Sequence, residues 1–302
     1  MLAVRLHRFG GPEVLAVEEA EPPVPGPGEI VILVGAASIN PFDRKVRTGM
    51  FAAGSEPVEP VIIGVDAAGV IAAVGPDVTG WSAGDPVFGI GRSTYAEQAV
   101  LHAWARKPDG IDDATAAAAA TTGEAALRSF DLLGLDPDAR LLIDGGAGGV
   151  GTVAIQLARR RGYRVVATGS AANQDYLRSL GAEPVEYGAG LADRVRALWP
   201  DGPDAVFDVA GKTIMDVLIG LAGEPRRVVS IANFGAADTG VQVTGGGGDP
   251  VAALAEVADA LAAGDLRIPV RTYPFADVVT AHRDSEAGGL RGKLALVLEH
   301  RA

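Results

Sequence analysis

The sequence predicts an α/β protein in which a mainly β domain comes before a domain built on a parallel sheet. Residues 1 to about 110 consist of short β-rich runs divided by Pro and Gly. From about 111 to 265, strand-like and helix-like segments alternate, which is typical of a doubly wound parallel sheet covered on both faces. The chain has 302 residues, enough for two domains with separate cores.

The elements follow in order along the chain. The turn-rich segment EPPVPGPGE precedes three β-rich runs, EIVILVGAASI, VIIGVDAAGVIAAVG and DPVFGI. Helices separate the five strands of the second region, which we expect near Leu141, Arg164, Pro184, Ala205 and Arg227. The segment TGGGGDP is interpreted as a flexible loop. The C-terminal stretch returns to short strands with one helix and is expected to fold back on the first domain, so the domain limits are 1–118 completed by 266–302, and 119–265.

A glycine-rich turn follows the first strand of the second region. The apolar run 141–143 comes before it, and helical spacing runs from Gly149 to Arg161. Gly146 permits the tight turn, Gly148 lets backbone N–H groups approach a pyrophosphate, and Gly151 lets the helix lie close to the strand. A helix N-terminus also favours negative charge. The sequence therefore predicts a dinucleotide site at this turn.

The next strand indicates which dinucleotide is bound. In NAD sites a carboxylate at the end of this strand holds the ribose 2′-hydroxyl. Here YRVVATGS ends in Thr168, Gly169 and Ser170, and the first carboxylate is Asp175. A carboxylate would repel a 2′-phosphate, so its absence favours NADP over NAD, although no arginine follows closely.

Composition excludes several other classes of protein. The chain has no cysteine, and its four histidines are too scattered for a local metal motif, so we expect no metal site. A formal net charge of −12 argues against partners such as nucleic acid or anionic membrane. The N-terminal stretch lacks a basic leader with a long apolar run, and a cytoplasmic location is expected.

A succession of motifs carries a family resemblance across essentially the whole chain. These motifs are SINPFDRKVRTG, GVDAAGVIAAVG, GDPVFG, YAEQAV, LIDGGAGGVGTVAIQLA, LRSLGA and RGKLALVL. Together they resemble the medium-chain dehydrogenase/reductase superfamily, in its zinc-free, zeta-crystallin-like quinone oxidoreductase and enone reductase branch. The resemblance implies a GroES-like β domain, a Rossmann domain, a cleft between them for NADPH, and a homodimer.

The sequence departs from the zinc enzymes of that superfamily at both metal-ligand positions. Zinc alcohol dehydrogenases carry a cysteine where this chain has INPFD, and Gly-His-Glu where it has Gly64, Val65 and Asp66. The cysteine-rich zinc lobe is absent as well. The resemblance therefore implies chemistry without zinc.

The resemblance also assigns the cofactor contacts. The pyrophosphate would lie against Gly146, Gly148, Gly149, Val150 and Gly151. Ser170 matches a serine on the 2′-phosphate, and Asn173 stands where many relatives have a lysine, which weakens the case for NADPH. Tyr187 matches a tyrosine near the adenosine phosphate, or is a half-buried aromatic at a strand end. The remaining expected cofactor contacts, most of them around the nicotinamide, are Thr122, Ala210, Ile231, Asn233, Phe234 and Lys293, of which Asn233 has a second interpretation as a turn residue.

The substrate side depends on NPFDRK. Asn40 matches an active-site asparagine and Asp43 its companion, while quinone reductases of the branch commonly have tyrosine where this chain has Lys45. Several enone and alkenal reductases show NPxDxK, so Lys45 favours reduction of a carbon–carbon double bond; its other interpretation is a solvated surface lysine. We expect Lys45 and Asn40 to stabilise the enolate oxygen, Asp43 to orient Lys45 or Arg47, and Tyr95 to line the pocket.

Three functions stay open at this stage. The first is an NADPH-dependent enone reductase that transfers hydride to the β-carbon of an α,β-unsaturated carbonyl. The second is an NADPH:quinone reductase that uses the same cleft, since a quinone is an extended enone. The third is a non-catalytic protein whose role is binding NADPH or regulation.

Overall fold

The computed structural model describes residues 1–52 and 54–299, and these form two compact units. The first unit comprises Met1–Thr121, Leu254–Ala262 and the stretch from Ile268 onward. The second comprises Thr122–Ala253 and Ala263–Arg267. The domain limits drawn from the sequence remain a prediction. They differ from these two units in assigning residues 254–262 to the parallel-sheet domain.

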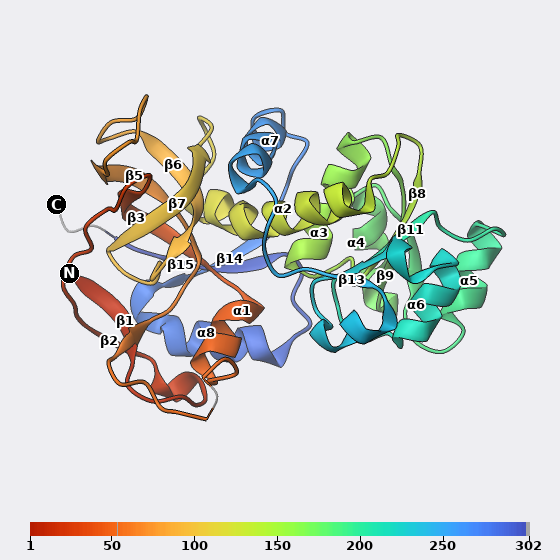
Figure 1. Ribbon diagram of the computed structural model, residues 1–302, viewed down its shortest axis with the longest axis horizontal. Helices are drawn as coiled ribbons and strands as arrows, with labels where there is room; N and C mark the ends of the chain where they lie inside the picture. The colour runs from red at the N-terminus through yellow and green to blue at the C-terminus, as the bar shows by residue number, and fades with distance from the viewer. Residues whose placement is uncertain (53, 300–302) are drawn as a thin grey trace. The chain divides into compact units, whose positions relative to one another are not determined.

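The first unit is built on a six-stranded sheet with the order β14-β15-β3-β5-β6-β7. Its strands are β3 (Ile30–Ile39), β5 (Asp66–Val74), β6 (Pro86–Arg92), β7 (Gln98–Arg106), β14 (Val270–Pro274) and β15 (Lys293–Val297). β3 also pairs with β7, so β3, β5, β6 and β7 close on one another (Figure 1). β15, from the C-terminal stretch, pairs antiparallel with β3.

Bulges and apolar side chains explain how this sheet closes around a core. The register of β3 against β5 shifts between Val31 and Ile32 and again between Val34 and Ala36, and such irregularities bend a strand. β3 is buried over almost its whole length because it pairs with β5, β7 and β15. A smaller sheet, in the order β2-β1-β4, adds β1 (Leu2–Leu6), β2 (Ala16–Glu19) and β4 (Val61–Ile62).

The second unit contains the predicted parallel sheet, with strand order β10-β9-β8-β11-β12-β13. The strands are β8 (Arg140–Asp144), β9 (Arg164–Gly169), β10 (Glu183–Glu186), β11 (Ala205–Asp208), β12 (Val228–Ser230) and β13 (Gln242–Val243). All neighbouring pairs are parallel, which confirms the α/β class and the five expected strands. The chain order reverses between β8 and β11, and ligands bind at the carboxyl ends of strands at such a point.

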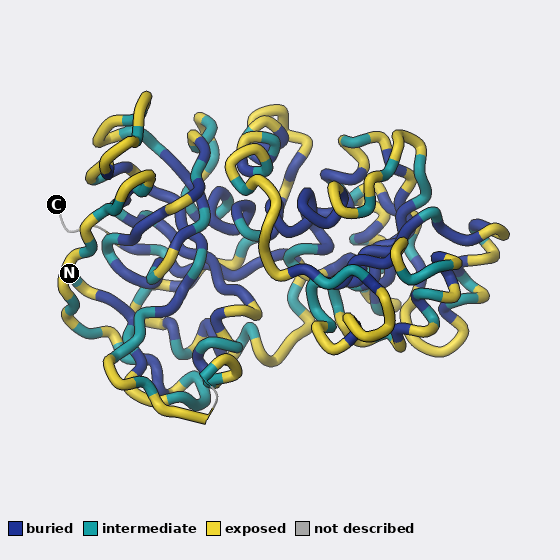
Figure 2. The backbone as a smooth tube through the Cα atoms, viewed as in Figure 1, coloured by how far each residue is buried: buried dark blue, intermediate teal, exposed yellow. Residues whose placement is uncertain are grey.

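Continuous apolar runs bury the strands of this sheet. β8, β9, β11 and β12 are buried at nearly every position (Figure 2). Such strands need helices on both faces. The main helices of this unit are α3 (Gly149–Arg160), α4 (Gln174–Ser179), α5 (Leu191–Leu198), α6 (Met215–Ala222) and much of α2 (Asp113–Leu133).

Among the described residues, three further α-helices and five short 3₁₀ turns complete the structure. They are α1 (Pro41–Arg47), α7 (Pro250–Ala262), α8 (Val278–Ala287) and the 3₁₀ turns Pro12–Val14, Ala171–Asn173, Pro225–Arg227, Phe234–Thr239 and Phe275–Asp277. Over residues 1–52 and 54–299, no helix combines the length and apolar content that crossing a bilayer requires.

α1 is a helix inside a region that the sequence assigned mainly to strands. It starts directly after β3, with Asn40 in an extended conformation at the N-cap and Pro41 in the first turn. Proline suits this position because its missing N–H has no partner in a helix. α1 carries most of the substrate-side residues that the sequence singled out.

Candidate active site

The side chain of Asp43 fixes the start of α1. Its Oδ2 atom accepts a hydrogen bond from the backbone N–H of Asn40 at 2.7 Å. This bond satisfies a helix-terminal donor and places the carboxyl group of Asp43 in the first turn of α1. The hydroxyl of Tyr95 donates to the same Oδ2 at 2.8 Å, while Oδ1 of Asp43 has no hydrogen-bond partner.

Both polar atoms of the Asn40 side chain form hydrogen bonds. Its Nδ2 donates to Oδ2 of Asp66 at 3.1 Å, and its Oδ1 accepts from Nζ of Lys293 at 2.5 Å. Nζ of Lys293 also donates to the carbonyl of Ile39 at 2.8 Å, and Oγ of Ser38 donates to Oδ1 of Asp66 at 2.8 Å. We call the side chains of Ser38, Asn40, Asp43, Asp66, Tyr95 and Lys293 the polar cluster.

Burial gives the polar cluster unusual protonation chemistry. Asp66 and Tyr95 are fully buried, and Asp43 and Lys293 are 1% and 6% exposed. Burial raises the pKa of Asp43 to about 7, the negative charge of Asp66 adds to that rise, and Lys293 opposes it. Burial also lowers the pKa of Lys293 and raises that of Tyr95.

The structure brings three of the four residues expected to be catalytic into one cluster: Asn40, Asp43 and Tyr95. Lys45 lies on the same helix and is partly exposed. Because residues two apart do not face each other on a helix, Lys45 and Asp43 lie on different sides of α1. Arg47 is fully buried and forms an ion pair with Glu286. The catalytic roles of these residues remain predictions.

Sequence reasoning missed two members of the polar cluster and placed a third elsewhere. Asp66 is a charged residue within the apolar run VIIGVDAAGVIAA, and that isolation is the signal that could have found it. Ser38 gives no such signal. Lys293, expected at the cofactor, makes its two hydrogen bonds inside the polar cluster.

In the second unit, the glycine turn joins β8 to α3 as predicted. A Cβ atom on Gly151 would lie 2.7 Å from Cα of Gly146 and would also meet the carbonyl of Gly145, so only glycine fits there. A Cβ on Gly148 would meet nothing closer than 3.9 Å, and Gly148 is exposed. No side chain caps the start of α3, so its N–H groups are available to an anion.

Two buried aspartates, Asp144 and Asp208, form hydrogen bonds at and beside this turn. Oγ1 of Thr168 donates to Asp144 at 2.6 Å and accepts from the N–H of Gly145 at 2.9 Å. On the neighbouring strand, Asp208 accepts from Ser230 at 2.7 Å and from the N–H of Gly211 at 2.8 Å. Burial raises the pKa of Asp208. These bonds fix the loops that follow β8, β9, β11 and β12.

β9 ends in Thr168 and Gly169, and Ser170 follows, so no carboxylate stands at this end. Ser170 begins a 3₁₀ turn that contains Asn173, and both are partly exposed. Asp175 points to solvent and pairs with Arg178. The backbone N–H of Tyr187 donates to the carbonyl of Gly169 at 3.3 Å, which brings Tyr187 to the same end of the sheet.

The loops expected near the nicotinamide also meet at the carboxyl ends of the strands. The N–H of Ala210 donates to the carbonyl of Asp144 at 3.1 Å, and that of Ile231 to the carbonyl of Asp208 at 3.1 Å. The N–H of Asn233 donates to Oγ of Ser230 at 3.0 Å. Phe234 is half-exposed, whereas Thr122 is buried on α2. Their contacts with a cofactor remain predictions.

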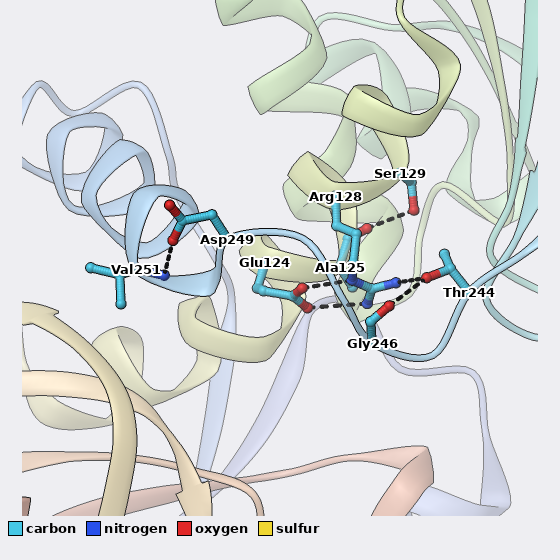
Figure 3. A network of polar contacts seen from close by, with 8 residues as sticks. All are labelled: Glu124, Ala125, Arg128, Ser129, Thr244, Gly246, Asp249 and Val251. Carbon is cyan, nitrogen blue, oxygen red and sulfur yellow. Dashed lines mark hydrogen bonds and ion pairs between the residues drawn. The ribbon is translucent and has the colours of Figure 1, made fainter. Parts of the chain in front are cut away.

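The glycine-rich segment interpreted as a flexible loop is anchored at both ends (Figure 3). Arg128 donates to both carboxylate oxygens of Glu124, one turn earlier on α2, and to Oγ1 of Thr244. Thr244 donates in turn to the carbonyl of Gly246 at 3.0 Å. At the other end, Asp249 accepts from the N–H of Val251 at 3.0 Å, at the start of α7. Both anchors restrict the segment.

The two units therefore offer different chemistry, each considered by itself. The second unit offers an open glycine turn and an uncapped helix N-terminus, which suit a pyrophosphate. The first unit offers a buried polar cluster beneath a helix that carries a partly exposed ammonium. Among the described residues, no three His, Asp or Glu side chains are grouped so that they could hold a metal ion.

Comparison with known families and proteins covers nearly the whole chain. The model of the alcohol dehydrogenase GroES-like domain matches residues 26–121, and that of the zinc-binding dehydrogenase matches 149–245. Quinone oxidoreductase from Pseudomonas aeruginosa is 30% identical, over 97% of this chain and 98% of that protein. The erythronolide synthase EryA2 of Saccharopolyspora erythraea is 33% identical over 89% of this chain, which spans only 8% of that protein. Tomato (Solanum lycopersicum) 2-methylene-furan-3-one reductase is 33% identical, over 68% of this chain and 55% of that protein.

Solved structures share the fold of both units. Mycobacterial Rv1454c complexed with NADPH has a TM-score of 0.84 and 29% identity, over 99% of this chain and all of that one. Escherichia coli quinone oxidoreductase complexed with NADPH has a TM-score of 0.84 and 25% identity, over 99% of this chain and all of that one.

Proposed function

This chain belongs to the medium-chain dehydrogenase/reductase superfamily, in its quinone oxidoreductase branch, and we propose that it is an NADPH-dependent enone reductase that works without zinc. The observation that carries the choice of substrate is Lys45. It is a partly exposed ammonium on α1, the helix whose start the polar cluster holds in place.

The glycine turn supports NADP(H) as the cofactor. Gly148 leaves room for a pyrophosphate, and α3 has no side-chain cap that would compete with it. No carboxylate stands at the end of β9, and Ser170 is partly exposed there to bond a 2′-phosphate. Two similar structures are complexes with NADPH. The reduced nicotinamide supplies a hydride when it is bound.

The protein's own part in the reaction is to stabilise charge on the substrate. When the β-carbon of an enone accepts a hydride, negative charge develops on the carbonyl oxygen. A donor placed at that oxygen stabilises the transition state more than the ground state. We assign this role to Lys45. Asn40 donates one amide N–H to Asp66 and, as a second donor, would offer its other one.

Quinone reduction is the second candidate. Similar proteins include several named quinone oxidoreductases, and a quinone presents the same conjugated carbonyl. The tomato relative is named for reduction of a methylene-furanone, an enone. Lys45 favours the enone, because the resemblance places NPxDxK in several enone and alkenal reductases, whereas quinone reductases of the branch commonly have tyrosine at this position.

The test is NADPH oxidation by the purified protein with a panel of enones and quinones, compared with NADH. We expect enones to be the better acceptors and Lys45→Ala to lower their kcat about a hundredfold, the usual cost of losing one oxyanion donor. Arg44→Ala is the matched control, since Arg44 is an exposed cation one residue away on α1. Its kcat should stay within about twofold of the parent.

Other outcomes would change the assignment. Turnover of quinones alone, unaffected by Lys45→Ala, would support the quinone reductase. NADPH binding without turnover of any acceptor would support the third function, a binding or regulatory protein. The homodimer and the cytoplasmic location remain predictions, and gel filtration with light scattering tests the first of them.

A further inference from the structure

Three buried charges meet in the first unit. Asp43 comes from α1, Asp66 from the start of β5 and Lys293 from the start of β15. Nζ of Lys293 donates hydrogen bonds to the carbonyl of Ile39 and to Oδ1 of Asn40. Asn40 then connects the two carboxylates, because its amide donates to Asp66 and its backbone N–H donates to Asp43.

The charges of this group balance only if one proton is retained. Two carboxylates and one ammonium would leave a net negative charge in a place that solvent barely reaches. Burying an uncompensated charge costs several kcal/mol, so a buried group takes up a proton instead. One carboxyl of the pair is therefore expected to stay protonated near neutral pH.

Hydrogen bonding identifies which carboxyl holds the proton. Both oxygens of Asp66 accept a hydrogen bond, one from Ser38 and one from Asn40, so neither oxygen can take a proton without disturbing a bond. On Asp43 both bonds fall on Oδ2, and Oδ1 has no partner. The bare Oδ1 is where a proton is held at the smallest loss of hydrogen bonding.

We propose that Lys293 is a positioning residue that fixes the amide of Asn40 and balances the charge of Asp66, leaving Asp43 to hold the one proton that the two carboxylates retain. Its consequence for catalysis rests on the proposed function, since Asp43 caps the helix that carries Lys45. Loss of the proton places a full negative charge in the first turn of α1. The interaction between Asp43 and the start of that helix therefore depends on pH.

The other charged groups nearby do not alter this balance. The ring of Tyr95 lies edge-on to His282, at 5.8 Å between centroids. Burial lowers the pKa of His282 to about 4, so it is neutral at pH 7. Arg47, which acts on Tyr95, is compensated by Glu286. Burial raises the pKa of Asp43 to about 7, in agreement with the proton assigned to it.

The test reads the protonated carboxyl of Asp43 by infrared difference spectroscopy across a pH titration. Asp43→Asn identifies the signal by removing it. Lys293→Met takes away the only ammonium of the polar cluster, so we expect the midpoint to rise by at least one pH unit, a tenfold gain in proton affinity. Asp66→Asn removes a negative charge at nearly the same size, so the midpoint should fall by a similar amount.

If the two single variants shift the midpoint in opposite directions, charge balance is responsible. A loss of packing alone would not raise the midpoint in one variant and lower it in the other. The double variant Lys293→Met/Asp66→Asn restores the balance and should return the midpoint close to that of the parent. If both single variants leave the midpoint in place, or move it in the same direction, the proposal is wrong. Asp66→Asn keeps the test decisive if Lys293→Met does not fold.

A second measurement links the proton to turnover. The pH profile of kcat/KM for NADPH and 2-cyclohexenone should shift in each variant in the same direction as the infrared midpoint. Profiles that do not follow the midpoint would overturn the catalytic consequence. An absence of turnover in the parent would instead count against the proposed function, while the infrared result would still decide the role of Lys293.

Discussion

At the scale of single residues, the pKa of Asp43 makes stability depend on pH. Its carboxyl releases a proton near 3.8 in the unfolded chain and near 7 in the folded protein. Between these values the folded state binds more protons, so a rise in pH favours unfolding. The contribution of Asp43 is therefore complete below about pH 4 and is lost as pH rises through 7.

This predicts a measurable difference between the parent and Asp43→Asn, whose amide resembles the protonated acid. Urea unfolding at several pH values should show the parent losing stability relative to the variant from pH 4 to 7, and little further change above pH 8. The loss is about 1.4 kcal/mol for each pKa unit. His282 acts in the opposite direction below pH 6.5, but it is present in both proteins and cancels. A constant difference across this range would contradict the prediction.

Asn173 makes the cofactor preference adjustable. It is partly exposed in the turn that follows β9, where we expect the 2′-phosphate of NADPH to bind. We expect Asn173→Lys to improve the KM for NADPH relative to NADH by about tenfold, since a charge-assisted bond to phosphate is roughly twice as strong as a neutral one. Asn173→Gln is the control and should leave the ratio unchanged. An equal gain with both cofactors would mean that residue 173 does not contact the phosphate.

At the scale of elements, the turn between β8 and α3 uses its glycines for two different reasons. Gly151→Ala would push a Cβ into the backbone of Gly145 and Gly146, so we expect the unfolding free energy to fall by about 1–3 kcal/mol. Gly148 has ordinary dihedral angles and open space around its Cα. Gly148→Ala should therefore fold like the parent and lose affinity for NADPH.

Two measurements check this contrast, thermal unfolding without cofactor and NADPH binding by fluorescence titration. We expect the Tm of Gly148→Ala to match that of the parent and its Kd to rise tenfold or more. An unchanged Kd would show that the backbone at Gly148 does not approach the pyrophosphate.

At the scale of the whole molecule, the buried ion pair of Glu124 and Arg128 connects distant parts of the chain. Arg128 also donates a hydrogen bond to Thr244, which lies 116 residues later (Figure 3). Both residues of the ion pair are 8% exposed, and removing one partner of a buried pair leaves an uncompensated charge. We expect Arg128→Met to cost about 3–5 kcal/mol of unfolding free energy and Glu124→Leu/Arg128→Met to recover most of it.

The matched control is the exposed pair of Asp175 and Arg178. Arg178→Met should change the unfolding free energy by no more than about 0.5 kcal/mol. If Arg128→Met and Arg178→Met lower the unfolding free energy equally, burial of the Glu124–Arg128 pair does not contribute to stability.

The parallel-sheet unit was predictable in outline, whereas the polar cluster was predictable only in part. Apolar runs and glycine spacing predicted β8, β9 and α3 to within about a residue, since each pattern is local. α1 was not expected, because its seven residues are too few for a periodic signal and its start depends on the side chain of Asp43. Asn40 and Asp43 were found through their motif, and Asp66 was not.

The sequence by itself determined the two-part α/β class and the glycine turn, since these depend on hydrophobic periodicity and backbone freedom within some twenty residues. Only the tertiary structure decided which charges meet. Asn40 bonds to partners 26 and 253 residues away, and burial together with the charge of Asp66 raises the pKa of Asp43. The physical reason is that desolvation and hydrogen bonding depend on neighbours in space, which order along the chain does not specify.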